Sequence, residues 1–284
     1  MVTKEFKVFT WQDILCDKFF SLDELKKLGF VGTAITIGVF DGVHLGHDVL
    51  LESVLSAKDC FSGVVTFSSN PSTVFFPEEY RGDITSMQQK LSRFKEKGLG
   101  FVVVIDFSSE FGKIEGKDFL SILKDKLSVA YIAEGQDFRC GYKGLTDMKA
   151  LKDFLLPQKV IVKTVPQVMV KEQRVSSSAI RKSILKGDFS LVKELLGRSY
   201  SLDCNQFLVQ YQQGSYRLFQ NKEHKSFQVL PPNGRYNLRI CVRQNNELLF
   251  YSVQGEVINN SLKFVFDSEE LQGQCFLDSV EFAE

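Results

Sequence analysis

The sequence predicts an α/β protein in two parts: a doubly wound parallel-sheet domain, residues 1–198, followed by a small antiparallel β domain, residues 199–284. From Thr33 to about Pro166, short continuous apolar runs alternate with longer segments of helical periodicity, which is typical of buried parallel strands covered by helices. From Tyr200 onward, apolar and polar residues alternate, as they do in half-buried antiparallel strands. A length of 284 residues also favours two domains.

The expected strands and helices follow one another along the chain. The strands of the first domain are the apolar runs 34–39, 63–67, 101–107, 129–133 and 160–165. Its helices, most with apolar residues three and four apart on one stripe, are 48–58, 86–97, 117–127 and 188–196. We expect a strand and a short helix, 21–28, ahead of this core. In the second domain, alternation marks strands at 237–242, 247–253 and 261–266, with turn residues at 231–234 and 259–260.

Composition and charge exclude several classes of protein. Hydrophobic residues make up 44% and charged residues 25% of the chain, which excludes disorder as its main state. The 35 Lys and Arg balance the 35 Asp and Glu, so no global positive field favours a nucleic-acid partner. No apolar run approaches the roughly 20 residues that span a bilayer, and the first residues lack a signal-peptide pattern. We therefore expect no membrane partner and a cytoplasmic location.

The segment 34–49 reads AITIGVFDGVHLGHDV, an apolar strand, a glycine-containing turn and a helix expected to begin near Gly46. A helix that starts at the carboxyl end of a parallel strand presents unpaired N–H groups and a positive dipole end, so this geometry predicts an anion site. His44 and His47 are three residues apart and could donate hydrogen bonds to charge that grows in a transition state. In isolation, the same two histidines could be a turn residue and a helix-surface residue.

With strand, turn and helix in this order, the segment resembles the H-x-G-H signature of the nucleotidyltransferase superfamily. More narrowly, it resembles the N-terminal module of the prokaryotic bifunctional FAD synthetases, which join riboflavin kinase to FMN adenylyltransferase. The resemblance implies a Rossmann-like nucleotidyltransferase domain, with His44 and His47 as catalytic residues. It also implies ATP contacts from Gly38, Phe40, Asp41 and Gly46.

Two further segments resemble the flavin side of this family. The first, 64–71, reads VVTFSSNP and is similar to F-x-P-H-P, with Ser69 and Asn70 in place of the usual Pro and His. The second, 133–141, reads AEGQDFRCG and is similar to G-x-D-F-x-F-G, with Cys140 at a usually aromatic position. The resemblance assigns flavin binding to Asn70, Pro71, Asp137 and Phe138. From the residues alone, the alternative for the first segment is a plain β turn, and the alternative for the second is a loop whose Asp caps its own turn.

The segment 174–181 reads RVSSSAIR and resembles R-x-S-S-T-x-I-R, the second nucleotide signature of the superfamily. Serines before an amphipathic helix are N-cap residues, which accounts for one of them. Arg181 lies one helical turn after Ser177, where a guanidinium can clamp phosphates attracted by the helix N-terminus. The resemblance makes Arg181 catalytic, assigns Ser177 and Ser178 to ATP and assigns Arg174 to the flavin.

From Ser201 onward the chain contains no P-T-A-N segment and no glycine-rich stretch of the kind that riboflavin kinase modules carry. The second domain therefore resembles a truncated or divergent, barrel-like kinase module. We predict an FMN adenylyltransferase that converts ATP and FMN into FAD and pyrophosphate, with Mg²⁺ accompanying ATP and no protein residue assigned as its ligand. The alternatives are a bifunctional enzyme with a divergent kinase, another nucleotidyltransferase such as a cytidylyltransferase or a pantetheine-phosphate adenylyltransferase, and a non-catalytic flavin-binding protein.

Overall fold

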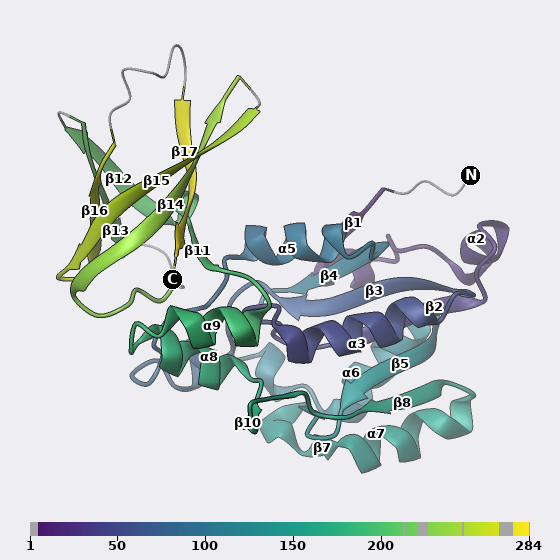
Figure 1. The fold of residues 1–284 in the computed structure, drawn as a ribbon. Helices are drawn as coiled ribbons and strands as arrows, with labels where there is room; N and C mark the ends of the chain where they lie inside the picture. Colours follow the sequence, from purple (N-terminus) through teal and green to yellow (C-terminus); the bar gives the residue numbers. More distant parts are fainter. Residues whose placement is uncertain (1–4, 213, 221–226, 246, 267–274, 284) are drawn as a thin grey trace. The chain divides into compact units, whose positions relative to one another are not determined.

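The computed structural model describes residues 5–212, 214–220, 227–245, 247–266 and 275–283 (Figure 1). The chain forms two compact units. One contains Met1–Phe40, Gly46–Glu79 and Leu91–Val168, and the other contains Asp41–Leu45, Tyr80–Lys90 and Met169–Glu284. The domain division expected after residue 198 stays a prediction.

The first unit is built on a parallel six-stranded sheet in the order β1-β4-β3-β2-β5-β8. Its strands are β1 (Lys7–Thr10), β2 (Gly32–Ile37), β3 (Cys60–Phe67), β4 (Phe101–Ile105), β5 (Val129–Gly135) and β8 (Ile161–Val165). After β2 the chain adds β3 and β4 on one side and then β5 and β8 on the other, so the strand order reverses between β2 and β5. The expected doubly wound sheet is confirmed, and this reversal is where such folds bind ligands.

Helices cover both faces of this sheet. The core on one face joins Ile35 and Ile37 of β2 to apolar residues of α1 (Trp11–Leu15), α6 (Gly116–Lys126) and α7 (Met148–Leu155). Figure 1 shows α3 (Leu45–Ser56) on the opposite face from α6. The remaining elements of this part of the chain are α2 (Leu22–Lys27), α4 (Ser72–Phe75), α5 (Met87–Glu96), η1 (Phe111–Lys113), β6 (Arg139–Cys140), η2 (Tyr142–Gly144), β7 (Thr146–Asp147) and η3 (Leu156–Gln158). None of the helices in the described residues is long and apolar enough to cross a membrane.

The N-terminal segment differs from the expectation of one strand and one helix. A second helix, α1, follows β1 directly and is only 5 residues long. It starts with a capping box, in which the Thr10 side chain accepts the Asp13 N–H and the Asp13 carboxylate accepts the Thr10 N–H. This helix was missed because a cap rather than an apolar stripe defines it.

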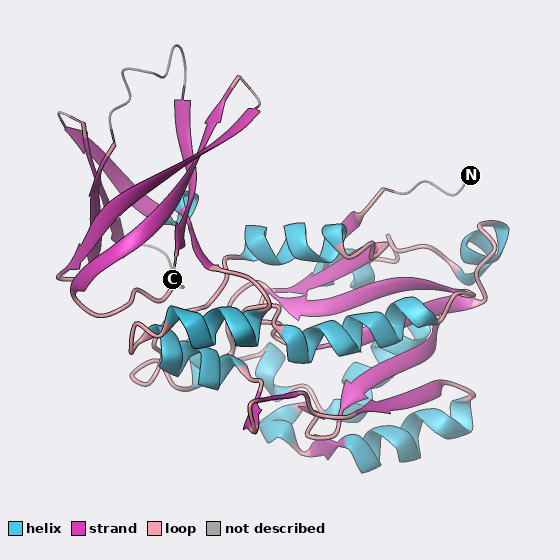
Figure 2. Cartoon of the chain, viewed as in Figure 1, coloured by secondary structure: helices cyan, strands magenta, loops and turns pink. Residues whose placement is uncertain are grey.

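The second unit contains a seven-stranded antiparallel sheet in the order β11-β17-β14-β15-β16-β13-β12. Figure 2 shows that this sheet curls into a barrel-like form, as the sequence predicts. Its strands are β11 (Tyr200–Asp203), β12 (Phe207–Gln212), β13 (Ser215–Gln220), β14 (Gly234–Gln244), β15 (Glu247–Ile258), β16 (Ser261–Val265) and β17 (Cys275–Phe282). The unit also contains β9 (Met169–Val170), β10 (Gln173–Arg174), α8 (Ser177–Ile184), α9 (Phe189–Leu196) and η4 (Cys204–Gln206).

Candidate functional site

The turn between β2 and α3 has a strained backbone. Phe40 (φ 52°), Gly42 (φ 90°) and Val43 (φ 37°) are all left-handed. Glycine adopts this conformation readily, whereas phenylalanine and valine do so at a cost of about 1–3 kcal/mol each. A Cβ added at Gly38, which opens the turn, would lie 3.1 Å from the Phe40 ring, so the ring would have to shift to accept it. Such strain is concentrated at ligand sites, and it marks this turn as a candidate.

His47 lies in the first turn of α3 and contacts the ring of Phe40, with ring centroids 5.0 Å apart. The Phe40 ring is itself buried and packs edge-on against Phe94 at 5.6 Å. The strained turn therefore supplies a fixed aromatic support for the imidazole of His47. Gly46 precedes it in the same first turn, where the N–H groups of the helix have no partner within the helix.

His44 directly precedes α3 and is only 5% exposed. Burial, with smaller effects of the positive charges of Arg198 and Arg174, lowers the pKa of His44 to about 4, and a hydrogen bond to the His44 backbone opposes this shift. The imidazole is therefore neutral at pH 7. The sequence assigns Arg174 to the flavin, and in the structure its charge acts on His44.

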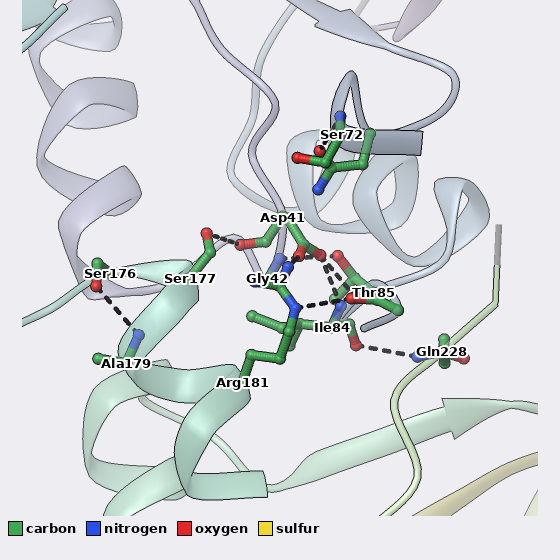
Figure 3. Close-up of polar contacts among 12 residues, drawn as sticks. Asp41, Gly42, Ser72, Ile84, Thr85, Ser176, Ser177, Ala179, Arg181 and Gln228 are labelled. Carbon is green, nitrogen blue, oxygen red and sulfur yellow. Dashed lines mark hydrogen bonds and ion pairs between the residues drawn. The ribbon is translucent and has the colours of Figure 1, made fainter. Parts of the chain in front are cut away.

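Asp41, which the sequence assigns to ATP, lies at the centre of a buried hydrogen-bond cluster (Figure 3). One carboxylate oxygen, Oδ1, accepts the N–H groups of Ile84 and Thr85 at 2.7 and 3.2 Å. The other, Oδ2, forms an ion pair with Nη2 of Arg181 at 2.5 Å. The Asp41 side chain thus faces the protein and fixes the turn to neighbouring segments.

Arg181 is occupied by contacts within its own unit. Besides the ion pair with Asp41, its Nε donates to the carbonyl oxygen of Gly82 at 2.7 Å, and its side chain is 18% exposed. The planar guanidinium therefore joins α8 to both the turn and the segment that contains Gly82. A direct contact of Arg181 with phosphate stays a prediction.

The serines at the start of α8 have three different environments. Ser176 is the N-cap, and its side chain accepts the Ala179 N–H at 3.2 Å, which confirms that one serine of the motif is a cap. Ser177 donates its hydroxyl to the carbonyl oxygen of Asp41 at 2.8 Å. Ser178 is exposed in the first helical turn, where its hydroxyl and the helix dipole are accessible to an anion.

Two more buried charges accompany the Asp41–Arg181 pair. Burial raises the pKa of Asp41, and the attraction of Arg181 opposes this shift. Burial also raises the pKa of Asp83 to about 7, with the charge of Asp41 acting in the same direction. Lys90 is 5% exposed; burial lowers its pKa, and the carboxylates of Asp83 and Asp41 oppose that change. The cluster therefore balances two acidic against two basic groups, which limits the cost of burying each one.

Residues that the sequence did not single out complete the support of the turn. Arg198 donates from Nη2 to the Gly42 carbonyl at 2.5 Å and from Nη1 to the Val43 carbonyl at 3.0 Å. Gln228 donates to the Ile84 carbonyl at 3.0 Å across 144 residues of sequence. Nothing local in the sequence marks Gln228 as part of this support.

The segment after β3 forms a local turn. The side-chain oxygen of Asn70 accepts the Ser72 N–H at 3.0 Å, and its backbone oxygen accepts the Thr73 N–H at 2.9 Å. Pro71 stands at the N-cap of α4. The turn expected from Asn-Pro is confirmed, and it uses the amide oxygen of Asn70 but not the amide nitrogen. A flavin contact of Asn70 or Pro71 stays a prediction.

The segment after β5 presents an exposed carboxylate, Asp137, above a packed aromatic ring. The Phe138 N–H donates to the Gly135 carbonyl at 3.0 Å, and the Phe138 ring packs against the core of the sheet. Cys140 also packs there, and burial raises the pKa of its thiol to about 12, so the thiol is neutral. Gly141 (φ 73°) must be glycine, because an added Cβ would lie 2.3 Å from the backbone of α6.

A metal centre is not formed by protein side chains in the described residues. No group of three or more His, Cys, Asp or Glu side chains is placed to hold an ion among them.

Comparison with known proteins gives relatives of one kind. The family model described as FAD synthetase matches residues 29–179. The bifunctional riboflavin kinase/FMN adenylyltransferase of Bacillus subtilis (strain 168) is 30% identical over 172 residues, which are 59% of this chain and 54% of that protein. The FAD synthetase of Listeria monocytogenes serovar 1/2a is 29% identical over 169 residues, 58% of this chain and 69% of that protein. The chain thus spans little more than half the length of most curated relatives that it matches.

One solved structure extends the likeness beyond this segment. The crystal structure of a macrolide-efflux protein from Streptococcus pneumoniae superimposes with a TM-score of 0.71 at 22% identity, covering 88% of this chain and 91% of that chain. At this identity the likeness shows the fold alone.

Proposed function

Because the chain belongs to the FAD synthetase family, we propose that it is an FMN adenylyltransferase, which transfers the AMP group of ATP to FMN and releases pyrophosphate to give FAD. The observation that carries this proposal is the family match over residues 29–179, which contains His44, His47 and the serines at the start of α8. The oxygen of the FMN phosphate attacks the α-phosphorus of ATP, a new P–O bond forms, and the bond from the α-phosphorus to the bridging oxygen breaks.

This reaction needs no covalent nucleophile from the protein. The FMN phosphate is ionised at neutral pH, since the second pKa of such a group is about 6. Catalysis then consists of positioning the two phosphates and stabilising the charge that moves to pyrophosphate. A site built from N–H groups, hydroxyls and helix N-termini provides this stabilisation.

We assign the phosphates to the turn and to the two helix starts. His44 acts as a neutral imidazole directly before α3 and His47 acts from the first turn of α3, while Ser178 binds the outer phosphates at α8. Gly38 and Gly46 allow close approach of the triphosphate. Arg174 adds positive charge beside His44.

Asp41 and Arg181 act through the backbone in this proposal. Their ion pair holds the turn that carries His44, and Ser177 reinforces it through the Asp41 carbonyl. Phe40 holds the imidazole of His47 in position through the contact between their rings. These residues determine where the donors lie and are positioning residues.

On the flavin side we assign Asn70, Pro71, Asp137 and Phe138. The amide nitrogen of Asn70 is not used in its own turn, and Asp137 is an exposed acceptor beside an aromatic ring. Amide nitrogen and carboxylate oxygens suit the polar edge of a flavin or its ribityl chain. Mg²⁺ enters with ATP, and the cytoplasmic location stays a prediction.

The test is to incubate the purified chain with Mg²⁺ and ATP, together with either FMN or riboflavin, and to resolve the flavins by chromatography. We expect FAD from FMN. Tight flavin binding without conversion would favour a non-catalytic flavin-binding protein. Activity with CTP, or with pantetheine phosphate in place of FMN, would favour another nucleotidyltransferase.

A further inference from the structure

Glu134 is a buried carboxylic acid for which the reaction above has no use. It is 1% exposed and lies one residue before the end of β5, among apolar residues of the sheet. Burying a carboxyl group among apolar residues destabilises the fold unless the group has a specific hydrogen-bond partner.

Its partner is a backbone group of the neighbouring strand. β2 and β5 pair at Ala34↔Tyr131 and Ile35↔Ile132, where their pairing ends, while β2 and β3 stay paired as far as Ile37↔Val65. Beyond Ile35, the side of β2 that faces β5 is left without a backbone partner. The Ile37 N–H donates instead to Oε1 of Glu134 at 2.7 Å. A side chain thus replaces a backbone hydrogen bond of the sheet.

This replacement occurs where the strand order reverses. Backbone pairing keeps strands about 4.8 Å apart, whereas an acceptor at the end of a side chain lets the strand ends separate further. In doubly wound folds, ligands bind at this point, beyond the carboxyl ends of the strands. Ile37 is followed directly by Gly38 and the strained turn, and Glu134 is followed by Gly135 and the Asp137 loop.

Burial of this carboxyl group favours its protonated form. Burial raises the pKa of Glu134 well above its usual value, and the Ile37 N–H and the Thr36 hydroxyl oppose this only in part. That hydroxyl is itself buried without a hydrogen bond of good geometry in the described residues. The titratable neighbour from β6 is Cys140, whose thiol is neutral and whose pKa is raised further by Glu134. Glutamine is therefore the closest mimic of this side chain.

We propose that Glu134 is a positioning residue for adenylyl transfer: it bridges the ends of β2 and β5 and sets the position of Gly38 and Phe40, which open the phosphate-binding turn, relative to the flavin-binding loop. This inference rests on the proposed function. The chemistry needed at the position is a neutral side chain that accepts one N–H.

The test compares two variants of Glu134. Glu134→Gln keeps a hydrogen-bond acceptor, whereas Glu134→Leu has a similar size but no acceptor. Gln136→Ala, at an exposed neighbour, is the control. Amide hydrogen exchange of residues 37–43 is measured on ligand-free protein, and kcat and KM are measured for ATP and FMN. We expect Glu134→Leu to exchange at least tenfold faster in this segment and to lose at least tenfold in kcat with smaller changes in KM, because misplaced groups lower the rate of the chemical step. Glu134→Gln and Gln136→Ala should stay within about threefold of wild type.

The proposal would be overturned if Glu134→Leu had the same exchange rates and kcat as the wild type. It would also be overturned if Glu134→Gln lost as much kcat as Glu134→Leu. If the Leu variant does not fold, Glu134→Asp shortens the reach of the carboxyl group, and unchanged exchange and kcat in that variant would overturn it as well. A wild-type protein that forms no FAD refutes the proposed function. The exchange measurement still decides whether Glu134 holds the turn.

Discussion

The imidazole of His44 and that of His47 are three residues apart but have different surroundings. His44 is buried beside arginine charges, while His47 is half-buried against the Phe40 ring. Burial of His44 disfavours its cationic form, so in the free protein this side chain is a neutral imidazole. The two histidines therefore support the same phosphates by different means in the proposed reaction.

His44→Ala and His47→Ala should each lower turnover by about 10² or more, the effect of losing one donor to transition-state charge. The measurement is the rate of FAD formation at saturating ATP and FMN. Glu52→Ala, an exposed change on the same helix, is the control. Near-normal turnover in either histidine variant would remove that residue from the proposed mechanism.

The depressed pKa of His44 also predicts a pH dependence of stability. Because the folded pKa is about 4 and the unfolded pKa about 6.5, the folded state binds the proton less readily. The contribution of His44 to the free energy of unfolding is complete above about pH 6.5 and is lost as the pH falls toward about 4. At pH 5 the wild type should have lost about 2 kcal/mol from this group.

In His44→Gln this loss should be absent. The difference in free energy of unfolding between wild type and His44→Gln should therefore shift by about 2 kcal/mol in favour of the variant between pH 7.5 and pH 5. Urea unfolding at both pH values measures it. If the free energies of unfolding of wild type and His44→Gln changed equally with pH, the buried imidazole of His44 would not be held neutral.

At the scale of elements, α8 is attached to the rest of its unit by its first two turns. Ser177 and Arg181 both bind Asp41, one at the backbone carbonyl and one at the carboxylate. The helix start and the strained turn are therefore fixed together, although 140 residues separate Asp41 from Arg181. A helix placed in this way presents its N-terminus in one orientation.

Arg181→Lys should raise the KM for ATP and lower turnover, each by about tenfold or more, because an ammonium cannot bridge Asp41 and the Gly82 carbonyl as a planar fork does. The measurement is an ATP titration at saturating FMN. Lys182→Arg, the reverse exchange at the next, exposed residue, is the control. If Arg181→Lys behaved like this control, the bridge would have no role in ATP binding.

The hydrogen bond between Ile37 of β2 and Glu134 of β5 predicts a pH effect on stability that is opposite in sign to the effect of His44. The folded pKa of Glu134 is raised, so the folded state keeps its proton while the unfolded state loses it above about pH 4.3. The wild type therefore loses stability as pH rises through this window, by about 1.4 kcal/mol per pH unit.

Glu134→Gln has no proton to lose and should gain stability relative to wild type between pH 5 and pH 7. Thermal or urea unfolding across this range measures the difference. A constant difference would mean that the carboxyl group is already ionised in the folded protein.

At the scale of the whole molecule, residues from the start of the curled sheet and from its loops support the candidate site. Gln228 binds the Ile84 carbonyl and accepts the Asp203 N–H, and Arg198 binds the turn itself. These contacts all lie within the second unit. The curled sheet and its loops therefore support residues of the candidate site whether or not the chain has kinase activity.

Riboflavin and ATP should yield no FMN, because the chain lacks the P-T-A-N segment and the glycine-rich stretch of a riboflavin kinase. FMN and ATP, assayed in parallel, should yield FAD. Chromatography of both reactions separates the three flavins. Steady accumulation of FMN from riboflavin would show that the second domain is a divergent kinase.

The sequence by itself determined the main strands of the parallel sheet, most of its covering helices, the antiparallel character of the second sheet and the location of the glycine turn before α3. It did not predict α7 or the four strands β11, β12, β13 and β17. The predicted features depend on local periodicity and on turn residues, which act over a few neighbours. Boundaries of the predicted elements shifted by a few residues, as when α3 ends at Ser56 instead of residue 58.

Only the tertiary structure decided which way the polar side chains point. Asp41 and Arg181 carry the residue types of a phosphate site, yet they bind each other because burial makes an unpaired charge more costly than a paired one. Glu134, Lys90 and Gln228 owe their roles to partners far along the chain, and no local pattern encodes such contacts. Local periodicity thus determined the framework, while long-range burial and charge pairing decided the contacts that support the candidate site.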